Sequence, residues 1–189
     1  MRAPDQDDIR LLAKALADSG AEYAVIGGAA MALHGFPRMT KDIDLLLPVD
    51  KPNNARLMKA FQSLPDLREA ARAIKQKWLD DGYSTAVEGE ISVDLLFVAA
   101  DRTYDELRKH VVIIDYDGVP ILTLDVDGML LTKKTSRESD KGDRLKLERL
   151  KSALASARNK EAGSNAKPAG APAPKGRGTR GQGRGKERG

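Results

Sequence analysis

Three aspartates stand inside apolar stretches of the sequence. Asp42 and Asp44 flank Ile43, and Asp94 interrupts the apolar run 91–98. Alternate side chains of a strand share one face, so Asp42 and Asp44 should point the same way while Ile43 points into the core. Two carboxylates on one strand face repel each other unless something positive lies between them. A divalent cation is the simplest candidate for that positive charge.

If the strand that carries Asp94 lies beside the first, three carboxylates converge. Three acids can hold two metal ions about 3.5–4 Å apart, the arrangement used in two-metal nucleotidyl transfer. Carboxylates favour Mg²⁺ or Mn²⁺, whereas a zinc site is not expected in a chain with no cysteine and two histidines. Asp42 and Asp44 would bind both ions, and Asp94, reaching only one, would help to deprotonate the acceptor.

The pair Gly27-Gly28 follows a short apolar run and precedes helix-forming residues. Glycine lets the backbone approach a phosphate closely, and the first N–H groups of a helix favour anions. Both glycines are therefore candidate nucleotide ligands. Arg38 and Thr40 would share the face of Asp42 if the strand extends back that far, which makes Arg38 a further candidate for phosphate contact.

The glycine pair, the spacer, the Asp-Ile-Asp strand and the later single aspartate resemble the signature of the DNA polymerase beta-type nucleotidyltransferase superfamily. The sequence Gly-Gly-Ala-Ala, followed by Arg38 and Thr40 ahead of Asp-Ile-Asp, is most similar to the small prokaryotic branch of this superfamily. That branch includes minimal nucleotidyltransferases and AbiEii-like toxins. The resemblance covers about residues 20–150. It implies transfer of a nucleoside monophosphate from a nucleoside triphosphate (NTP) to RNA, a protein hydroxyl or a small molecule. For a toxin, it also implies an antitoxin partner.

A later cluster of charged residues resembles the Lys…Arg…Asp-Lys…Asp region of the same branch. Its members are Lys133, Lys134, Arg137, Asp140, Lys141 and Asp143. The resemblance implies that basic side chains there, Lys134 and Arg137 above all, reach the triphosphate from a C-terminal helix. The chain departs from many superfamily members at Gly28, where they carry serine. Any phosphate contact at this position must therefore come from backbone N–H groups.

The pattern of elements predicts an α/β fold of the nucleotidyltransferase type, a mixed sheet flanked by helices with a C-terminal helical portion. Helices are predicted over residues 7–19, 29–34, 54–78 (broken at Pro65), 101–110, 125–134 and 139–157. Strands are predicted over residues 22–26, 40–47, 84–88, 91–98, 111–115 and 119–122. Gly89 and Asp117-Gly118 indicate two hairpins. Phe61 and Trp78 lie on apolar helix faces and are predicted to be core residues.

Residues 160–189 form a predicted disordered basic tail, and residues 1–159 a single nucleotidyltransferase domain. The tail holds eight Lys or Arg and two Glu and contains no large apolar side chain, so it cannot offset its ordering entropy by burial. Two interpretations of the tail remain open. It is either an inert extension or a weak, salt-dependent binder of polyanions.

No apolar run approaches the roughly 20 residues of a membrane helix, and the first ten residues carry three aspartates in place of an apolar signal core. A cytoplasmic protein without membrane contact is therefore expected. The alternative to an enzyme is a non-catalytic nucleotide- or RNA-binding regulatory module of the same fold. Three converging carboxylates argue against that alternative, because a binding module has no need of them.

Overall fold

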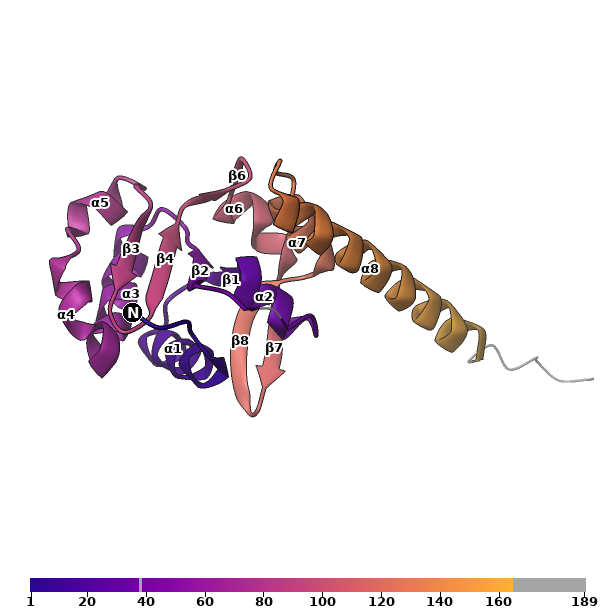
Figure 1. Ribbon diagram of the computed structural model, residues 1–189, viewed down its shortest axis with the longest axis horizontal. Helices are drawn as coiled ribbons and strands as arrows, with labels where there is room; N and C mark the ends of the chain where they lie inside the picture. The colour runs from indigo at the N-terminus through magenta and orange to yellow at the C-terminus, as the bar shows by residue number, and fades with distance from the viewer. Residues whose placement is uncertain (38, 165–189) are drawn as a thin grey trace, which may run out of the picture. The chain divides into compact units, whose positions relative to one another are not determined.

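The computed structural model describes residues 1–37 and 39–164, with side chains described to residue 160. A six-stranded mixed sheet with strand order β3-β4-β2-β1-β8-β7 lies at its centre (Figure 1). The strands are β1 Ala24–Ile26, β2 Asp42–Leu46, β3 Thr85–Glu88, β4 Ser92–Leu96, β7 Val111–Tyr116 and β8 Val119–Leu124. A separate two-stranded ribbon consists of β5 Val98–Ala99 and β6 Arg102–Thr103.

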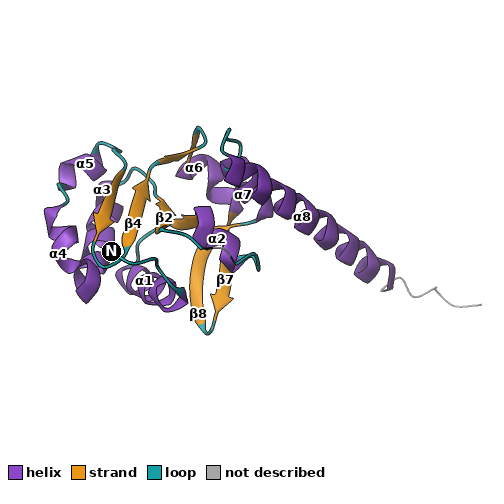
Figure 2. Ribbon diagram, viewed as in Figure 1, coloured by secondary structure: helices purple, strands orange, loops and turns teal. Residues whose placement is uncertain are grey.

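Helices precede, interrupt and follow the strands (Figure 2), which confirms the predicted α/β class. They are α1 Gln6–Ser19, α2 Gly27–Leu33, α3 Lys51–Ser63, α4 Pro65–Ala73, α5 Gln76–Asp80, α6 Tyr104–Leu107, the 3₁₀-helix η1 Arg108–His110, α7 Val126–Thr132 and α8 Glu138–Ser164. Among the described residues, no helix is both long enough and apolar enough to span a membrane.

Both predicted hairpins form, β3 with β4 and β7 with β8, each antiparallel. The second turns at Asp117 and Gly118, whose φ angles of 50° and 80° are those that an Asp-Gly hairpin turn requires. At the centre of the sheet, β2 pairs in parallel with β4 and antiparallel with β1. The two apolar strands that carry aspartates are therefore direct neighbours.

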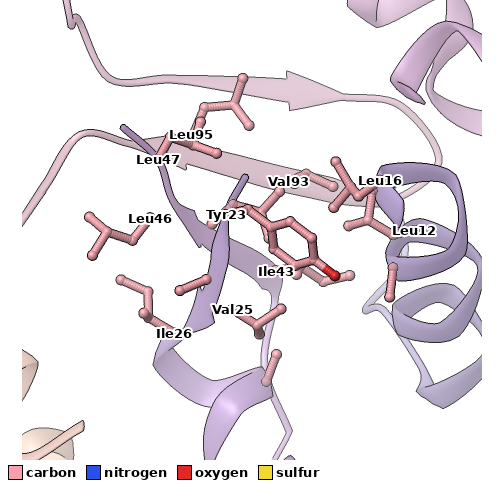
Figure 3. Packing of buried hydrophobic residues seen from close by; sticks show 14 of the residues in the cluster. Leu12, Leu16, Tyr23, Val25, Ile26, Ile43, Leu46, Leu47, Val93 and Leu95 are labelled. Atoms are coloured by element: carbon pink, nitrogen blue, oxygen red, sulfur yellow. The ribbon is translucent and has the colours of Figure 1, made fainter. Parts of the chain in front are cut away.

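One face of the central strands is sealed by apolar packing. Ile43 and Val93 lie on this face and are fully buried, as is Leu16 of α1. Figure 3 shows Leu12 and Leu16 of α1 packed close to Tyr23 and Ile43. Because strand side chains alternate, burying Ile43 against α1 turns its two neighbours to the opposite face of the sheet. The core thereby fixes the orientation of both aspartates of β2.

The helical stretch predicted as two pieces is three helices and begins earlier than expected. Asp50 caps α3 by accepting the N–H of Asn53 at 2.6 Å, and Pro52 suits the first helical turn. The break at Pro65 is confirmed, but the chain leaves helical geometry again at Ile74. Of the two aromatic residues predicted in the core, Phe61 is buried. The prediction for Trp78 is wrong, since it is 42% exposed.

The last helix, α8, runs beyond its predicted end at residue 157 and reaches Ser164. It therefore includes the first five residues of the segment predicted as a tail. The rest of that segment, residues 165–189, lies outside the described residues. The domain boundary at residue 159 and the properties of the basic tail stay predictions.

Candidate active site

The register of the central strands brings the three predicted aspartates to one face of the sheet. Asp44 of β2 is the direct partner of Asp94 on β4, and Asp42 is the partner of Ser92. On the other side, Asp44 is paired with Ile26, the last residue of β1 before α2. The three half-buried carboxylates of Asp42, Asp44 and Asp94 are called the acid face below.

The carboxylates of the acid face repel one another in a partly desolvated place. Burial raises the pKa of Asp44 from 3.8 to about 6, and the charges of Asp42 and Asp94 add to the shift. Burial also raises the pKa of Asp94, reinforced by Asp42 and by Glu88 on β3. The strand pattern did not single out Glu88, whose partner in the sheet is Ser92. The acid face therefore carries more negative charge than its surroundings neutralise.

We expect the raised pKa of Asp44 to make stability depend on pH. A carboxyl group whose pKa is higher in the folded chain binds more protons there, so its contribution to stability falls as pH rises from about 4 through 6. At pH 7.5 without metal, the ionised carboxylate of Asp44 lowers the free energy of unfolding by at most about 3 kcal/mol. Asp44→Asn removes this charge and with it the loss of stability. Urea unfolding in EDTA should thus find the variant more stable than wild type at pH 7.5, with the advantage lost at pH 4. An equal difference at both pH values would contradict the prediction.

The backbone of Gly27 passes directly against the carboxylate of Asp44. A Cβ atom at Gly27 would lie 1.8 Å from Oδ2 of Asp44, and the φ angle of Gly27 is +67°. Only glycine meets both conditions without strain. Gly28 is buried inside the first turn of α2, and no side chain caps that turn. Of the two predicted glycine ligands, Gly27 is thus the one whose contact with the acid face the structure describes.

Gly27→Ala should damage both the fold and the acid face. The positive φ alone costs about 1–2 kcal/mol, and the new methyl group must also displace Asp44. The matched control is Gly118→Ala, where φ is +80° but nothing lies within 4 Å of the added Cβ. Thermal unfolding should show a clearly larger loss at Gly27, and nucleotide binding should fall only there. Equal losses in both variants would show that contact with Asp44 is unimportant.

Thr40 lies beside the acid face, although β2 begins only at Asp42. Its hydroxyl donates to Oδ1 of Asp42 at 3.3 Å and to the carbonyl oxygen of the same residue at 3.0 Å. The strand predicted from residue 40 thus begins two residues later, and Thr40 contacts Asp42 through a hydrogen bond across a bend. Arg38, predicted to contact phosphate, lies outside the described residues.

Lys133, which is not among the predicted nucleotide ligands, is buried and joins the acidic residues of the C-terminal cluster. Lys133, at the end of α7, is 6% exposed, and its Nζ lies 3.1 Å from Asp140 and 3.0 Å from Asp143. Both acids are buried and lie one turn apart on α8. Burial raises the pKa of Asp140, but hydrogen bonds from Thr135 and Lys133 outweigh it and leave the pKa below its ordinary value. The ion pairs tie α8 to the end of α7.

The charges of Lys133 and Arg137 reach the acid face, because both lower the pKa of Asp44 against the stronger effect of burial. Arg137 is exposed in the segment between α7 and α8, so its guanidinium is accessible to a ligand. Lys134 is also exposed, but no contact ties it to the acid face. The structure thus brings Arg137 and Lys133 into electrostatic reach of the aspartates and leaves the role of Lys134 a prediction.

The acid face offers only carboxylate oxygens as side-chain donors, which is the ligand type that hard cations such as Mg²⁺ prefer. Asp44 and Asp94 occupy paired positions on adjacent strands, about 4.8 Å apart, whereas Asp42 lies two residues, roughly 7 Å, further along. Among the described residues, no group of three acidic, histidine or cysteine side chains is arranged to hold a metal ion without adjustment. Side-chain rotations would have to bring the carboxylates together. A cation would offset the burial of Asp44 and the charges of Asp42 and Asp94, which together raise the pKa of Asp44.

The mixed sheet, with an Asp-Ile-Asp strand beside a single-aspartate strand, has the arrangement expected of nucleotidyltransferase-type proteins. Residues 10–127 match the family model described as "Nucleotidyl transferase AbiEii toxin, Type IV TA system". The chain belongs to this AbiEii family, which confirms the resemblance drawn from its sequence. A search of curated proteins found no match.

Two solved structures are similar to the chain. One is described as a "putative nucleotidyltransferase" from Thermotoga maritima; it is 18% identical, with 82% of this chain and 91% of that chain covered and a TM-score of 0.42. The other is an antigenic nucleotidyltransferase-like protein from Paracoccidioides brasiliensis; it is 17% identical, with 78% of each chain covered and a TM-score of 0.47.

Proposed function

We propose that this chain is a metal-dependent nucleotidyltransferase that moves a nucleoside monophosphate from an NTP to an acceptor and releases pyrophosphate. The observation that carries the proposal is the pairing of Asp44 with Asp94, with the backbone of Gly27 held against Asp44. An ordinary fold gains nothing from three carboxylates on one sheet face, since burial together with the charges of Asp42 and Asp94 raises the pKa of Asp44 and destabilises the chain.

In this proposal, Asp42 and Asp44 bind two Mg²⁺ or Mn²⁺ ions, and Asp94 binds one of them. Two bound ions would supply positive charge that stabilises the leaving pyrophosphate and acidifies the acceptor hydroxyl. The strand register places the three carboxylates on one face, and side-chain rotations would bring them together around the ions. Their mutual repulsion in the absence of metal favours cation binding.

The chain's own residues then have distinct tasks. The acceptor oxygen forms a bond to the α-phosphorus, the bond between the α-phosphorus and the bridging oxygen breaks, and pyrophosphate leaves. Asp94 takes up the acceptor's proton, a role that suits a carboxyl group with a raised pKa. The triphosphate is held by Gly27, Gly28, Arg38, Lys134 and Arg137. Lys133 positions the segment that carries Arg137 through its buried ion pairs.

Family membership further suggests that the chain acts as a toxin in the cytoplasm, balanced by an antitoxin partner. RNA, a protein hydroxyl and a small molecule all remain open as acceptors, and the basic tail is proposed to add weak polyanion affinity. Expression of the wild-type chain should arrest growth, whereas expression of Asp44→Asn at the same level should not. Growth arrest by both chains would separate toxicity from nucleotidyl transfer.

The transfer reaction is tested by incubating the purified chain with each α-labelled NTP, Mg²⁺ or Mn²⁺, and a total cell extract. Label should appear in RNA, protein or a small-molecule fraction, which names the acceptor class. γ-Labelled NTP is the matched control, because transfer of a nucleoside monophosphate leaves that label in pyrophosphate. Nucleotide binding without transfer from any α-labelled NTP would favour the regulatory binding module instead.

A further inference from the structure

Two more polar residues lie beside the acid face, one on β4 and one on β3. Ser92 of β4 is the direct partner of Asp42, and Glu88 of β3 is in turn the direct partner of Ser92. Directly paired residues share one face of a sheet, so these three side chains form a row next to Asp94. Polar side chains therefore continue from the acid face across β4 to the sheet edge at β3.

Ser92 is buried without the hydrogen bond that a buried hydroxyl normally makes. It is only 8% exposed, and its hydroxyl has no partner among the described residues. The buried hydroxyls of Thr123 and Thr132, in contrast, donate to backbone carbonyl oxygens at 2.8 and 3.0 Å. In the described part of the chain, the unpaired polar side-chain atoms that are completely buried belong to Arg10, Asn54 and Arg56. The Ser92 hydroxyl is not one of these atoms, so it is unpaired yet accessible to a ligand.

The charge around the acid face is uneven. At β2, two basic residues of the C-terminal cluster lower the pKa of Asp44 against the effect of burial. At β4, burial raises the pKa of Asp94, and the charges that act on it, those of Asp42 and Glu88, raise it further. Glu88 is exposed and forms no ion pair within the residues that the structure describes. A triphosphate is therefore favoured on the side of the basic residues, which leaves the side of β3 for the acceptor.

We infer, on the basis of the proposed nucleotidyl transfer, that Ser92 and Glu88 bind the acceptor and that the acceptor carries an ammonium group close to its reacting hydroxyl. The Ser92 hydroxyl forms a hydrogen bond with the hydroxyl group of the acceptor, and the Glu88 carboxylate pairs with the ammonium group. In the reaction, the acceptor oxygen bonds to the α-phosphorus, its proton passes to Asp94, and pyrophosphate leaves.

The charge of Glu88 also disfavours RNA as the acceptor. Metal ions at the three aspartates would leave the Glu88 carboxylate uncompensated at the outer edge of the site, where it repels the phosphates of a nucleic acid. A hydroxyl next to an ammonium group occurs both in small amino alcohols and where a serine or threonine lies beside a lysine in a protein. Both sources offer the same chemistry, and fractionation of the acceptor separates them.

The acceptor class is tested by incubating the full chain, α-labelled NTP and Mg²⁺ or Mn²⁺ with the small-molecule, protein and RNA fractions of a cell extract. Each fraction is used before and after acetylation of its amines, which removes their positive charge and leaves hydroxyl groups free. We expect label in the small-molecule or the protein fraction, reduced about tenfold or more by acetylation. Label in the RNA fraction, or labelling that acetylation leaves unchanged, would overturn the acceptor class but not nucleotidyl transfer. Absence of label from every fraction would contradict nucleotidyl transfer itself.

Ser92→Ala should weaken acceptor binding and leave the fold intact. The amount of acceptor fraction that gives half-maximal transfer should rise about three- to tenfold, with the KM for NTP unchanged. Urea unfolding should match wild type, because no hydrogen bond within the chain is lost. Thr123→Ala is the matched control, since its hydroxyl bonds to Val25 and its removal should lower the urea midpoint. A Ser92→Ala chain that is destabilised like Thr123→Ala but uses the acceptor normally would show that Ser92 is only structural.

Glu88→Lys should reduce transfer to the native acceptor by about tenfold or more, because it places an ammonium group against that of the acceptor. The KM for NTP should not rise. Glu90→Lys is the matched control, an equal charge change at an exposed residue of the same hairpin that does not act on the pKa of Asp94. It should transfer like wild type. Equal losses in the two variants, or no loss in either, would overturn the role of Glu88.

Discussion

Asp44→Asn should reduce nucleotidyl transfer by about a hundredfold to a thousandfold, which is the scale seen when one preorganised electrostatic contact is removed. Asp44 is the central residue of the acid face, paired with Asp94 on one side and in contact with Gly27 on the other. The substitution keeps the side chain's shape and removes a charge that both proposed metal ions would need. Initial rates of transfer from α-labelled NTP measure the effect.

The matched control is Asp18→Asn, an isosteric change at an exposed residue of α1 that pairs with Lys14. Its transfer rate should equal that of wild type, because an exposed ion pair of this kind contributes little to stability. Circular dichroism and urea unfolding should show that Asp44→Asn is folded. Near-wild-type transfer by a folded Asp44→Asn chain would remove the acid face from the mechanism.

Lys133→Met should cost about 3–5 kcal/mol of unfolding free energy, the range observed when one partner of a buried ion pair is removed. Lys133 forms ion pairs with Asp140 and Asp143, both buried, and the substitution removes the ammonium group they share. Urea unfolding at pH 7.5 measures the loss. Transfer should fall as well, since Arg137 would no longer be held near the acid face.

An exposed lysine of α8, Lys151, provides the comparison. Lys151 pairs with Asp127 at 2.6 Å, but both side chains are more than half exposed, so Lys151→Met should cost about 0–1 kcal/mol. Adding Asp140→Asn and Asp143→Asn to Lys133→Met should recover much of the lost stability, because no buried charge then lacks compensation. If Lys133→Met and Lys151→Met lower the free energy of unfolding equally, burial of the Lys133 ion pairs adds nothing to stability.

The local pattern of the acid face was readable in the sequence, but its assembly was not. An aspartate on either side of a buried isoleucine fixes the shared face of Asp42 and Asp44 by strand alternation alone. Their alignment with Asp94 depends on β2 and β4 being adjacent and parallel, with Asp44 opposite Asp94. A slip of one residue would have turned Asp94 into the core. The sequence allowed the two aspartate-bearing strands to be neighbours, and the structure shows that they pair with Asp44 opposite Asp94.

Residues whose burial depends on distant elements were predicted less well. The resemblance placed Lys133 in a cluster whose basic side chains reach the triphosphate, but Lys133 is buried and pairs with Asp140 and Asp143 on α8. The spacing of those two acids, one helical turn apart, was the available signal. Trp78 was expected in the core from its helical face, yet α5 is only five residues long and leaves the ring partly exposed beside Lys75.

The central claim is that the acid face binds metal ions together with a nucleotide, and Mn²⁺ binding tests it most directly. Electron paramagnetic resonance can count the Mn²⁺ ions held by the full chain with a non-hydrolysable NTP analogue, relative to the analogue alone. We expect two protein-dependent ions in wild type, fewer in Asp94→Asn and none in Asp42→Ala/Asp44→Ala. Equal Mn²⁺ binding by the wild-type and doubly substituted chains would contradict the claim.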